Sequence, residues 1–434
     1  MKKILFIIVL SLLTILAFSI DFGGTLEDSS IYYSSDSSSF YHSDTLSLWL
    51  TTDLWEDTNL FVQGSYTYTT DDPSFFDLDY LKVVNTGTAL VNYTFGRFYT
   101  SDPTGYIFGH RLDGADFTFN LPAVIISAKA GYTGFLFNTN SNIEMSTADQ
   151  TGVSNGSISQ DFATPRIAGG LEAFFPDLHF HQDLKASVWA QIDMRDDSDV
   201  TKENTSTPSG LGGKINTQYF GLVLSGPIAA TLFYDSFAWL GTGKTLSYID
   251  NSYTYEPILS FLGSIGFRYY MEELLYSRIS FRFLFSSGDK DYTSSFVEGN
   301  TEGNATNFIP ISKKSLAMVF SPQLGNILFT QASYSLKPFS RSKNKTLDNI
   351  QFELTDINFF RSTTGQISES GINPSSTSQY LGTEIDGTVN FRPYSDFGVS
   401  LSGGVFIPSS GEDKAFMDSK DVEYLGRLGL SFSF

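Results

Sequence analysis

Residues 277–286 read SRISFRFLFS, and the rest of the chain follows the pattern that they set. Apolar and polar side chains alternate here, and the apolar ones are Ile279, Phe281, Phe283 and Phe285. A period of two places the two sets on opposite faces of an extended strand. Arg278 and Arg282 therefore lie opposite the phenylalanines. Such a strand needs an apolar medium on one face and water on the other.

The same alternation recurs through the chain after residue 19. Stretches of about 9 to 13 residues show it, a length typical of tilted strands that cross a membrane. No segment shows sustained helical periodicity. We expect an all-β fold: about 18 antiparallel strands, with 16 also possible, closed into one transmembrane β-barrel. The predicted strands begin near residues 23, 44, 59, 77, 88, 113, 124, 165, 183, 216, 228, 257, 277, 326, 348, 379, 396 and 423.

The connections between these stretches alternate in length. Short turns on one side are followed by long connections rich in Ser, Thr, Asn, Gly and Asp, at 138–164, 194–215, 287–325 and 361–378. Short periplasmic turns and long extracellular loops are typical of outer-membrane barrels. The segment 315–321 could be one more strand, but these barrels have an even number of strands, so we assign it to the loop 287–325. That loop could fold inward and narrow the lumen.

The composition also fits a barrel with one face in lipid. Aromatic residues make up 15% of the chain and charged residues 17%, which is low for a soluble surface. The mean hydropathy of -0.07 is too polar for a bundle of membrane helices. A soluble β-sandwich is the alternative fold. The formal net charge of -20 argues against a nucleic-acid partner, and the absence of cysteine excludes disulfides and thiolate metal sites.

The N-terminus has the features of an export signal. Lys2 and Lys3 precede an apolar run from residue 4 to residue 18, which is short for a spanning helix of ~20 residues. Small residues at Ala17 and Ser19 suit a cleavage site. We therefore expect residues 1–19 to be a signal peptide and residues 20–434 to be the barrel. An uncleaved membrane anchor is the alternative.

The C-terminal residues 423–434 read EYLGRLGLSFSF. One face of this strand carries Tyr424, Leu428, Leu430, Phe432 and Phe434. The segment resembles the terminal β-signal of bacterial outer-membrane barrels, and the mature chain resembles their porin-like family. The segments 95–98 (FGRF) and 112–116 (LDGAD) add to that resemblance. The resemblance implies insertion into outer-membrane lipid, with the barrel-assembly machinery reading the C-terminal strand.

Charged side chains occur on the polar faces of several predicted strands. Three basic residues lie on two adjacent strands: Arg268, Arg278 and Arg282. Three acidic residues lie about half a circumference away: Asp77, Asp79 and Asp116. A second acidic group consists of Glu353, Glu384 and Asp386. We expect all of them to line the lumen, because an arginine at the lipid midplane costs roughly 2–4 kcal/mol. Either they form opposed walls with a transverse field that orients polar solutes, or they pair with one another.

These features predict a porin-like outer-membrane channel for passive diffusion of small hydrophilic solutes, as a monomer or a homotrimer. The alternative is an adhesion or binding barrel that displays its extracellular loops. No segment has the motif of a hydrolase or a phosphate-binding loop, so we expect neither an enzyme nor a cofactor. His179 and His181 share one side of an extended segment without an evident third ligand, so we expect no metal site.

Overall fold

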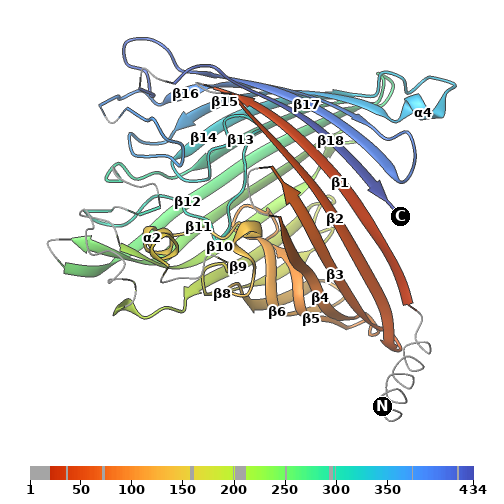
Figure 1. Cartoon of the computed structure of the whole chain (residues 1–434), viewed down its shortest axis with the longest axis horizontal. Coiled ribbons are helices and arrows are strands. Elements are labelled where there is room, and N and C mark those ends of the chain that lie inside the picture. Colours follow the sequence, from red (N-terminus) through yellow and green to blue (C-terminus); the bar gives the residue numbers. More distant parts are fainter. Residues whose placement is uncertain are drawn as a thin grey trace.

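The computed structural model contains one antiparallel sheet of eighteen strands that closes into a barrel (Figure 1). The predicted fold class and strand number are confirmed. The predicted signal peptide, residues 1–19, lies outside the described residues. The structure describes residues 20–434 apart from 36–37, 71–73, 157–160, 199, 201–211, 250–251, 293–296, 299, 374 and 418–419.

The strands follow the chain around the barrel, each paired with its neighbours in sequence. They are β1 (Ile20–Ser34), β2 (Ser38–Trp55), β3 (Thr58–Thr69), β4 (Phe75–Asn85), β5 (Val91–Ser101), β6 (Gly109–Asn120), β7 (Ile125–Tyr132), β8 (Arg166–Phe175), β9 (Asp183–Asp193), β10 (Gly212–Ala229), β11 (Leu232–Ile249), β12 (Ser252–Met271), β13 (Ser277–Ser286), β14 (Ile327–Leu336), β15 (Ile350–Arg361), β16 (Tyr380–Phe391), β17 (Phe397–Pro408) and β18 (Glu423–Ser433). Short helical segments lie in the connections: η1 (Asn138–Asn140), α2 (Thr147–Asn155) and α4 (Lys345–Asp348).

The barrel closes where β1 meets β18. The two strands pair from Thr25 opposite Ser433 to Ser34 opposite Tyr424. Beyond the ladder, the backbone N–H groups of Gly24 and Phe434 each donate to the other residue's carbonyl, at 3.0 Å in both cases. Closure matters because hydrocarbon cannot satisfy an open sheet edge, and each unsatisfied group there costs several kcal/mol.

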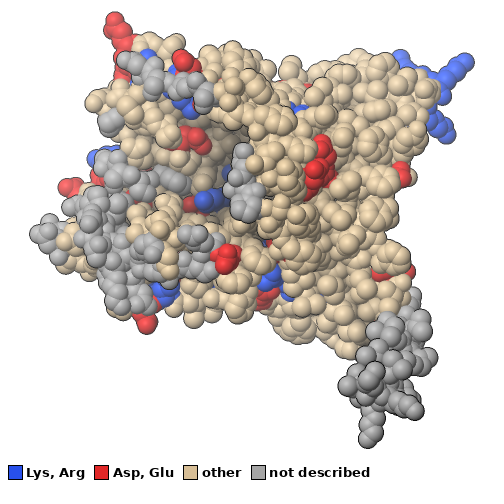
Figure 2. Space-filling model, in the orientation of Figure 1, with Lys and Arg blue, Asp and Glu red and all other residues tan. Residues whose placement is uncertain are grey.

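The two faces of the wall differ as the alternation requires. Ile279 and Phe281 are 47% and 43% exposed on the outside, although they are large and apolar. Arg278 and Arg282, from the same strand, instead form ion pairs with side chains two strands away in the sheet, on β15 and β11. Much of the outer wall carries no charged side chain (Figure 2). Among the described residues, no helix is long and apolar enough to cross a membrane.

The two ends of the barrel also differ. The connections of 133–165 and 287–326 lie at one end, on the left of Figure 1, which we call the loop end. The start of β1 and the C-terminus lie at the other, which we call the turn end. The segment 315–321 forms no strand, as expected. Predicted and observed strand starts differ most at β2 and β12, which extend further toward the loop end through polar residues such as Ser38 and Ser252.

Backbones approach closely around Gly96 of β5, which lies opposite Gly114 of β6. Gly96 has a φ of 110°, and a Cβ atom there would lie 2.1 Å from the carbonyl oxygen of Leu81. Only glycine tolerates both conditions.

We therefore expect Gly96→Ala to lower the free energy of unfolding by at least about 1–3 kcal/mol, the strain typical of such a backbone. Urea titration of the barrel in detergent measures this. Gly387→Ala is the control, because a Cβ atom at Gly387 meets nothing within 4 Å. Equal midpoints for the two variants would contradict the argument.

Candidate functional site

The longest connection, residues 287–326 between β13 and β14, folds into the barrel, and we call it the inward loop. Its backbone first pairs with β12, where the Ala305 N–H donates to the Pro257 carbonyl at 2.8 Å. The hydroxyl of Tyr219 on β10 donates to the Ile309 carbonyl. Phe308 packs against the Tyr219 ring and is fully buried. The loop therefore narrows the lumen, as the sequence suggested it could.

A single carboxylate on the barrel wall holds the far part of the inward loop. Glu384 on β16 accepts the backbone N–H groups of Met318 and Val319 at 2.8 Å and that of Phe320 at 2.7 Å. The Glu384 side chain is fully buried. Hydrogen bonds to an ionised acceptor are worth roughly 1.5–3 kcal/mol each. We call these three bonds the Glu384 tether.

An aromatic cluster reinforces the tether. The Phe320 ring stacks on Phe406 of β17, with ring centroids 4.2 Å apart. Phe359 of β15 and Phe416 meet the same ring edge-on, at 5.1 and 5.9 Å. These four side chains belong to a hydrophobic core inside the barrel. The inward loop is thus packed against the wall and does not hang free in water.

A second, shorter loop, residues 102–108 between β5 and β6, reaches toward β9 and β11. The Asp102 carboxylate fixes its shape by accepting several backbone N–H groups of the loop, including that of Phe108 at 2.9 Å. Phe108 stacks on Trp189 of β9, with centroids 5.2 Å apart. The Ile311 N–H donates to the Ile107 carbonyl at 2.9 Å. The two loops therefore meet within the lumen and form one constriction.

A third connection, residues 133–165, covers this constriction from the loop end. Its helix α2 is capped at the N-terminus by Ser146, whose side chain forms a capping box with Asp149. Asp149 also binds Arg166 of β8 at 2.7 Å and Arg195 at 2.9 Å. All four of these side chains are nearly buried. Buried ion pairs of this kind hold a loop in one geometry.

Two buried carboxyl groups lie where this connection meets the inward loop. The backbone N–H of Glu144 donates to Ile311, and Glu298 accepts the Thr147 N–H at 2.7 Å. Burial raises the pKa of Glu144 to about 7, against the opposing effect of Lys313. Burial likewise raises the pKa of Glu298 to about 7. Packing of these loops is thus coupled to the uptake of protons near neutral pH.

The structure places the three predicted arginines beside acidic partners. Arg282 binds Asp235 of β11 at 2.8 Å, and Arg268 lies 3.6 Å from the other oxygen of the same carboxylate. Arg278 lies 3.6 Å from Glu353. Basic and acidic groups therefore alternate along this wall. Sequence reasoning missed Asp235, although it lies on a predicted strand.

The acidic residues Asp77 and Asp79 are paired as well. Arg111 of β6 binds Asp77 at 2.9 Å and Asp79 at 2.7 Å. Arg97, in the FGRF segment, lies 4.0 Å from Asp77. Local pairs of this kind favour the interpretation in which the charged side chains pair with one another. They do not favour opposed basic and acidic walls.

Asp116 lies opposite Lys129 in the β6–β7 register, and Lys129 binds Glu172 at 3.3 Å. Glu353, Glu384 and Asp386 lie on β15 and β16. Of these three, Glu384 serves the tether, and Asp386 lies beside it with one oxygen that has no hydrogen-bond partner. Asp386 and Glu353 both line a cavity of about 450 Å³ next to the inward loop.

That cavity joins the inward loop to the polar wall. The loop contributes residues 315–318 and Ser321, and β18 contributes Arg427. Glu353, Thr388 and Arg427 give it groups of both charges and a hydroxyl. The lining thus combines hydrogen-bonding groups with apolar side chains such as Leu316 and Ile357. Sequence reasoning did not single out Arg427.

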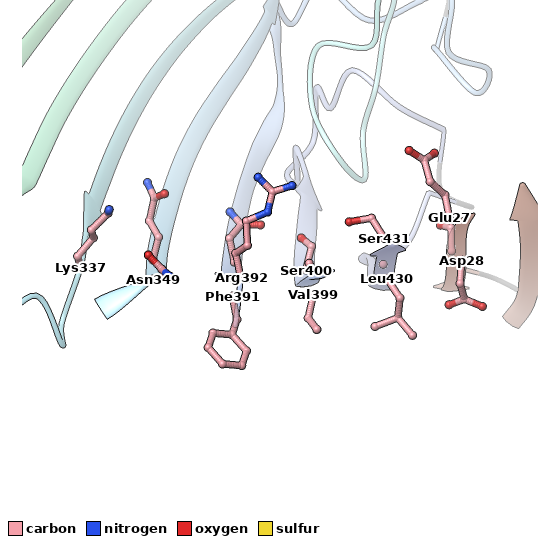
Figure 3. Close-up of a pocket in the computed structure, with 15 residues that line it drawn as sticks. Glu27, Asp28, Lys337, Asn349, Phe391, Arg392, Val399, Ser400, Leu430 and Ser431 are labelled. Carbon is pink, nitrogen blue, oxygen red and sulfur yellow. The ribbon is translucent and has the colours of Figure 1, made fainter. Parts of the chain in front are cut away.

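A second cavity, of about 530 Å³, lies near the turn end (Figure 3). The side chains of Glu27, Lys337 and Arg392 project to one side of the wall, whereas Phe391 and Leu430 project to the other (Figure 3). The polar side is the lumen, because Glu27 and Arg392 alternate with the apolar residues of the outer wall. The lumen is thus polar on both sides of the constriction.

Comparison with known proteins identifies the fold. No protein-family model and no curated protein sequence matches the chain. Solved structures do match: OccK11 (OpdR) of Pseudomonas aeruginosa has a TM-score of 0.58 at 11% identity, over 96% of both chains. OccK8 (OprE) of the same organism has a TM-score of 0.58 at 12% identity, over 96% of this chain and 98% of that one. OccK5 (OpdH) of Pseudomonas aeruginosa has a TM-score of 0.56 at 13% identity, over 95% of this chain and 98% of that one. These are outer-membrane porins, and the predicted resemblance to porin-like barrels is confirmed at the level of the fold.

Proposed function

We propose that this protein is a channel in the bacterial outer membrane through which small hydrophilic solutes diffuse passively. The observation that carries the proposal is a closed barrel whose outer wall is apolar and whose inner wall is polar on both sides of an internal constriction. An 18-strand barrel is wide enough for an aqueous lumen, whereas ~8 strands would be filled by their own side chains. The fold shared with outer-membrane porins supports the same location and role.

The constriction limits the size of what passes. The inward loop and the loop 102–108 fill part of the lumen with a packed apolar core. The remaining polar surface includes the cavity at Glu353 and Arg427. We assign the predicted lumen charges to the wall of this path, where local ion pairs offer hydrogen-bond partners of both kinds.

The inward direction of the loops supports a channel over an adhesion barrel. A barrel that displays its loops to another cell or a phage needs them outside the wall. Here the connections 133–165 and 287–326 instead contribute buried residues such as Ile143, Phe308 and Phe320 to the interior. We further propose that residues 1–19 are cleaved on export. The barrel-assembly machinery would then read the strand that ends at Phe434.

Planar-bilayer recording tests the channel directly. We expect the refolded barrel to give stepwise ion currents, because polar side chains line the lumen on both sides of the constriction. Liposome swelling with sugars and amino acids should show faster entry of smaller solutes. Current steps in groups of three would indicate a homotrimer. Intact, correctly folded barrels that carry no current would refute the proposal.

The Glu384 tether provides a second test. Glu384→Ala removes the acceptor of three backbone N–H groups. The loop should then leave the wall for part of the time, so we expect a larger mean conductance and more current noise. Glu384→Gln keeps one acceptor oxygen, so its mean conductance and current noise should lie between those of the unaltered channel and of Glu384→Ala. Glu272→Ala is the control, because Glu272 is exposed in the turn between β12 and β13, away from the inward loop. Unchanged noise in Glu384→Ala would contradict the role of the tether.

The buried carboxyl groups predict a pH dependence. Because the pKa values of Glu144 and Glu298 are raised to about 7 by burial, the packed loops bind more protons than released loops do. Loop packing is then most stable below the ordinary carboxyl pKa and weakens as the pH rises through about 7. Current noise should therefore increase from about pH 5 to about pH 8. The double variant Glu144→Gln, Glu298→Gln should lose most of this pH dependence. If its current noise changes with pH as much as that of the unaltered channel, these two carboxyl groups are not its cause.

A further inference from the structure

Polar side chains interrupt the apolar outer wall where β1 meets β2. In the register of these strands, Asp28 lies opposite Asp44, and Ser30 lies opposite His42. All four side chains lie on the same face of the wall as Leu26, whose side chain is 46% exposed on the outside. Figure 3 shows Asp28 projecting to the same side as Leu430, Val399 and Phe391, away from Glu27 and Ser431. Acidic side chains over β1 are visible on this part of the wall (Figure 2).

The surroundings of this group are apolar. Leu26 and Leu46 form the next outward pair toward the turn end. On the neighbouring strands, Leu430 lies opposite Asp28, and Tyr68 lies opposite Asp44. Carboxylates in contact with lipid or its interface are costly unless a partner neutralises them.

Among the described residues, no lysine or arginine forms an ion pair with Asp28 or Asp44. The sequences of β1, β2 and β3 contain neither lysine nor arginine. The one basic residue of β18, Arg427, lines the lumen cavity beside the inward loop and is therefore on the other face of the wall. In the part of the chain that the structure describes, the two carboxylates thus share His42 as their one basic neighbour.

His42 lies between the two carboxylates. Its Nδ1 is 3.7 Å from Asp28 Oδ2, and its Nε2 is 3.2 Å from Asp44 Oδ2. A protonated imidazole would neutralise one of the two negative charges and leave the other. A divalent cation, bound by a neutral imidazole and both carboxylates, would neutralise both.

From this geometry we propose that Asp28, His42 and Asp44 form a binding site for a divalent transition-metal ion such as zinc. Their ligand atoms all lie within 4.8 Å of one another. Ligand bonds of ~2 Å place neighbouring ligand atoms ~3–4 Å apart, so small rotations of side chains suffice. One imidazole nitrogen with two carboxylate oxygens is a ligand set that zinc accepts, whereas calcium and magnesium prefer oxygen alone.

Ser30 supports the site through a contact with His42. Its hydroxyl lies 3.0 Å from His42 Nδ1, at hydrogen-bond distance. A hydrogen bond to one ring nitrogen typically orients a histidine whose other nitrogen binds a metal. The ion would join β1 to β2 beside the seam where β1 closes on β18, and it would therefore stabilise the closed barrel.

Zinc titration of the full chain, folded in detergent and free of chelators, tests the site. We expect one zinc ion per barrel by calorimetry and a higher unfolding temperature with zinc. The double variant Asp28→Asn, Asp44→Asn and the single variant His42→Gln should each weaken binding more than about a hundredfold. Co²⁺ in place of zinc should give a visible absorption band that the same variants lose. Because the chain has no cysteine, thiolates cannot account for the binding.

His181→Ala is the matched control. His181 also contacts a carboxylate, with Nδ1 2.8 Å from Asp177 Oδ1, but it is highly exposed and has no second acidic partner in the described structure. Binding should survive this substitution. Electrophoresis with and without heating verifies that each variant forms the barrel. Folded protein without bound zinc, or equal affinities of the His42→Gln and unaltered proteins, would overturn the proposal. Zinc binding and the unfolding temperature are measured without channel conductance. A negative result for the zinc site therefore does not bear on the proposed channel function.

Discussion

Every feature of this molecule depends on the need of a backbone in hydrocarbon to pair all its N–H and C=O groups within the protein. Eighteen antiparallel strands meet that need only as a closed ring, and β1 meets β18 to complete it. Closure then fixes the chemistry of the side chains. Alternate residues face lipid and must be apolar, while the others surround water. Departures from this alternation on the outer wall, such as the carboxylates at β1 and β2, therefore call for a specific explanation.

Loops inside the barrel must also pair their backbone N–H groups, and side chains serve as acceptors for some of them. Loops that enter the lumen bring unpaired N–H groups with them, and carboxylates satisfy these groups: Glu384 for the inward loop and Asp102 for the loop 102–108. Aromatic packing around Phe320 and Phe108 then adds an apolar core inside the ring. The barrel thus holds two environments side by side, a packed constriction and a polar path. Neither the ion pairs of the wall nor the loops alone would produce this division.

Much of the fold follows from the period of two. The alternation at 277–286 identifies both the strand and the face that carries its arginines, and the even strand number assigns 315–321 to a loop. Side-chain contacts between strands lie beyond such reasoning, because they require the register. The pairs of Arg282 with Asp235 and of Arg111 with Asp77 join residues far apart in sequence. A shift in pairing between β3 and β4 also breaks the simple parity, so that Tyr80 packs against Phe61 of the neighbouring strand.

The Glu384 tether binds main-chain amides, not side chains. Residues 318 and 319 can therefore mutate widely without releasing the loop, provided that neither becomes proline. Evolution could then retune what the constriction admits by exchanging the side chains beside the 450 Å³ cavity while the anchoring carboxylate stays fixed. The same separation of anchor from lining makes this segment a practical place to engineer new permeability.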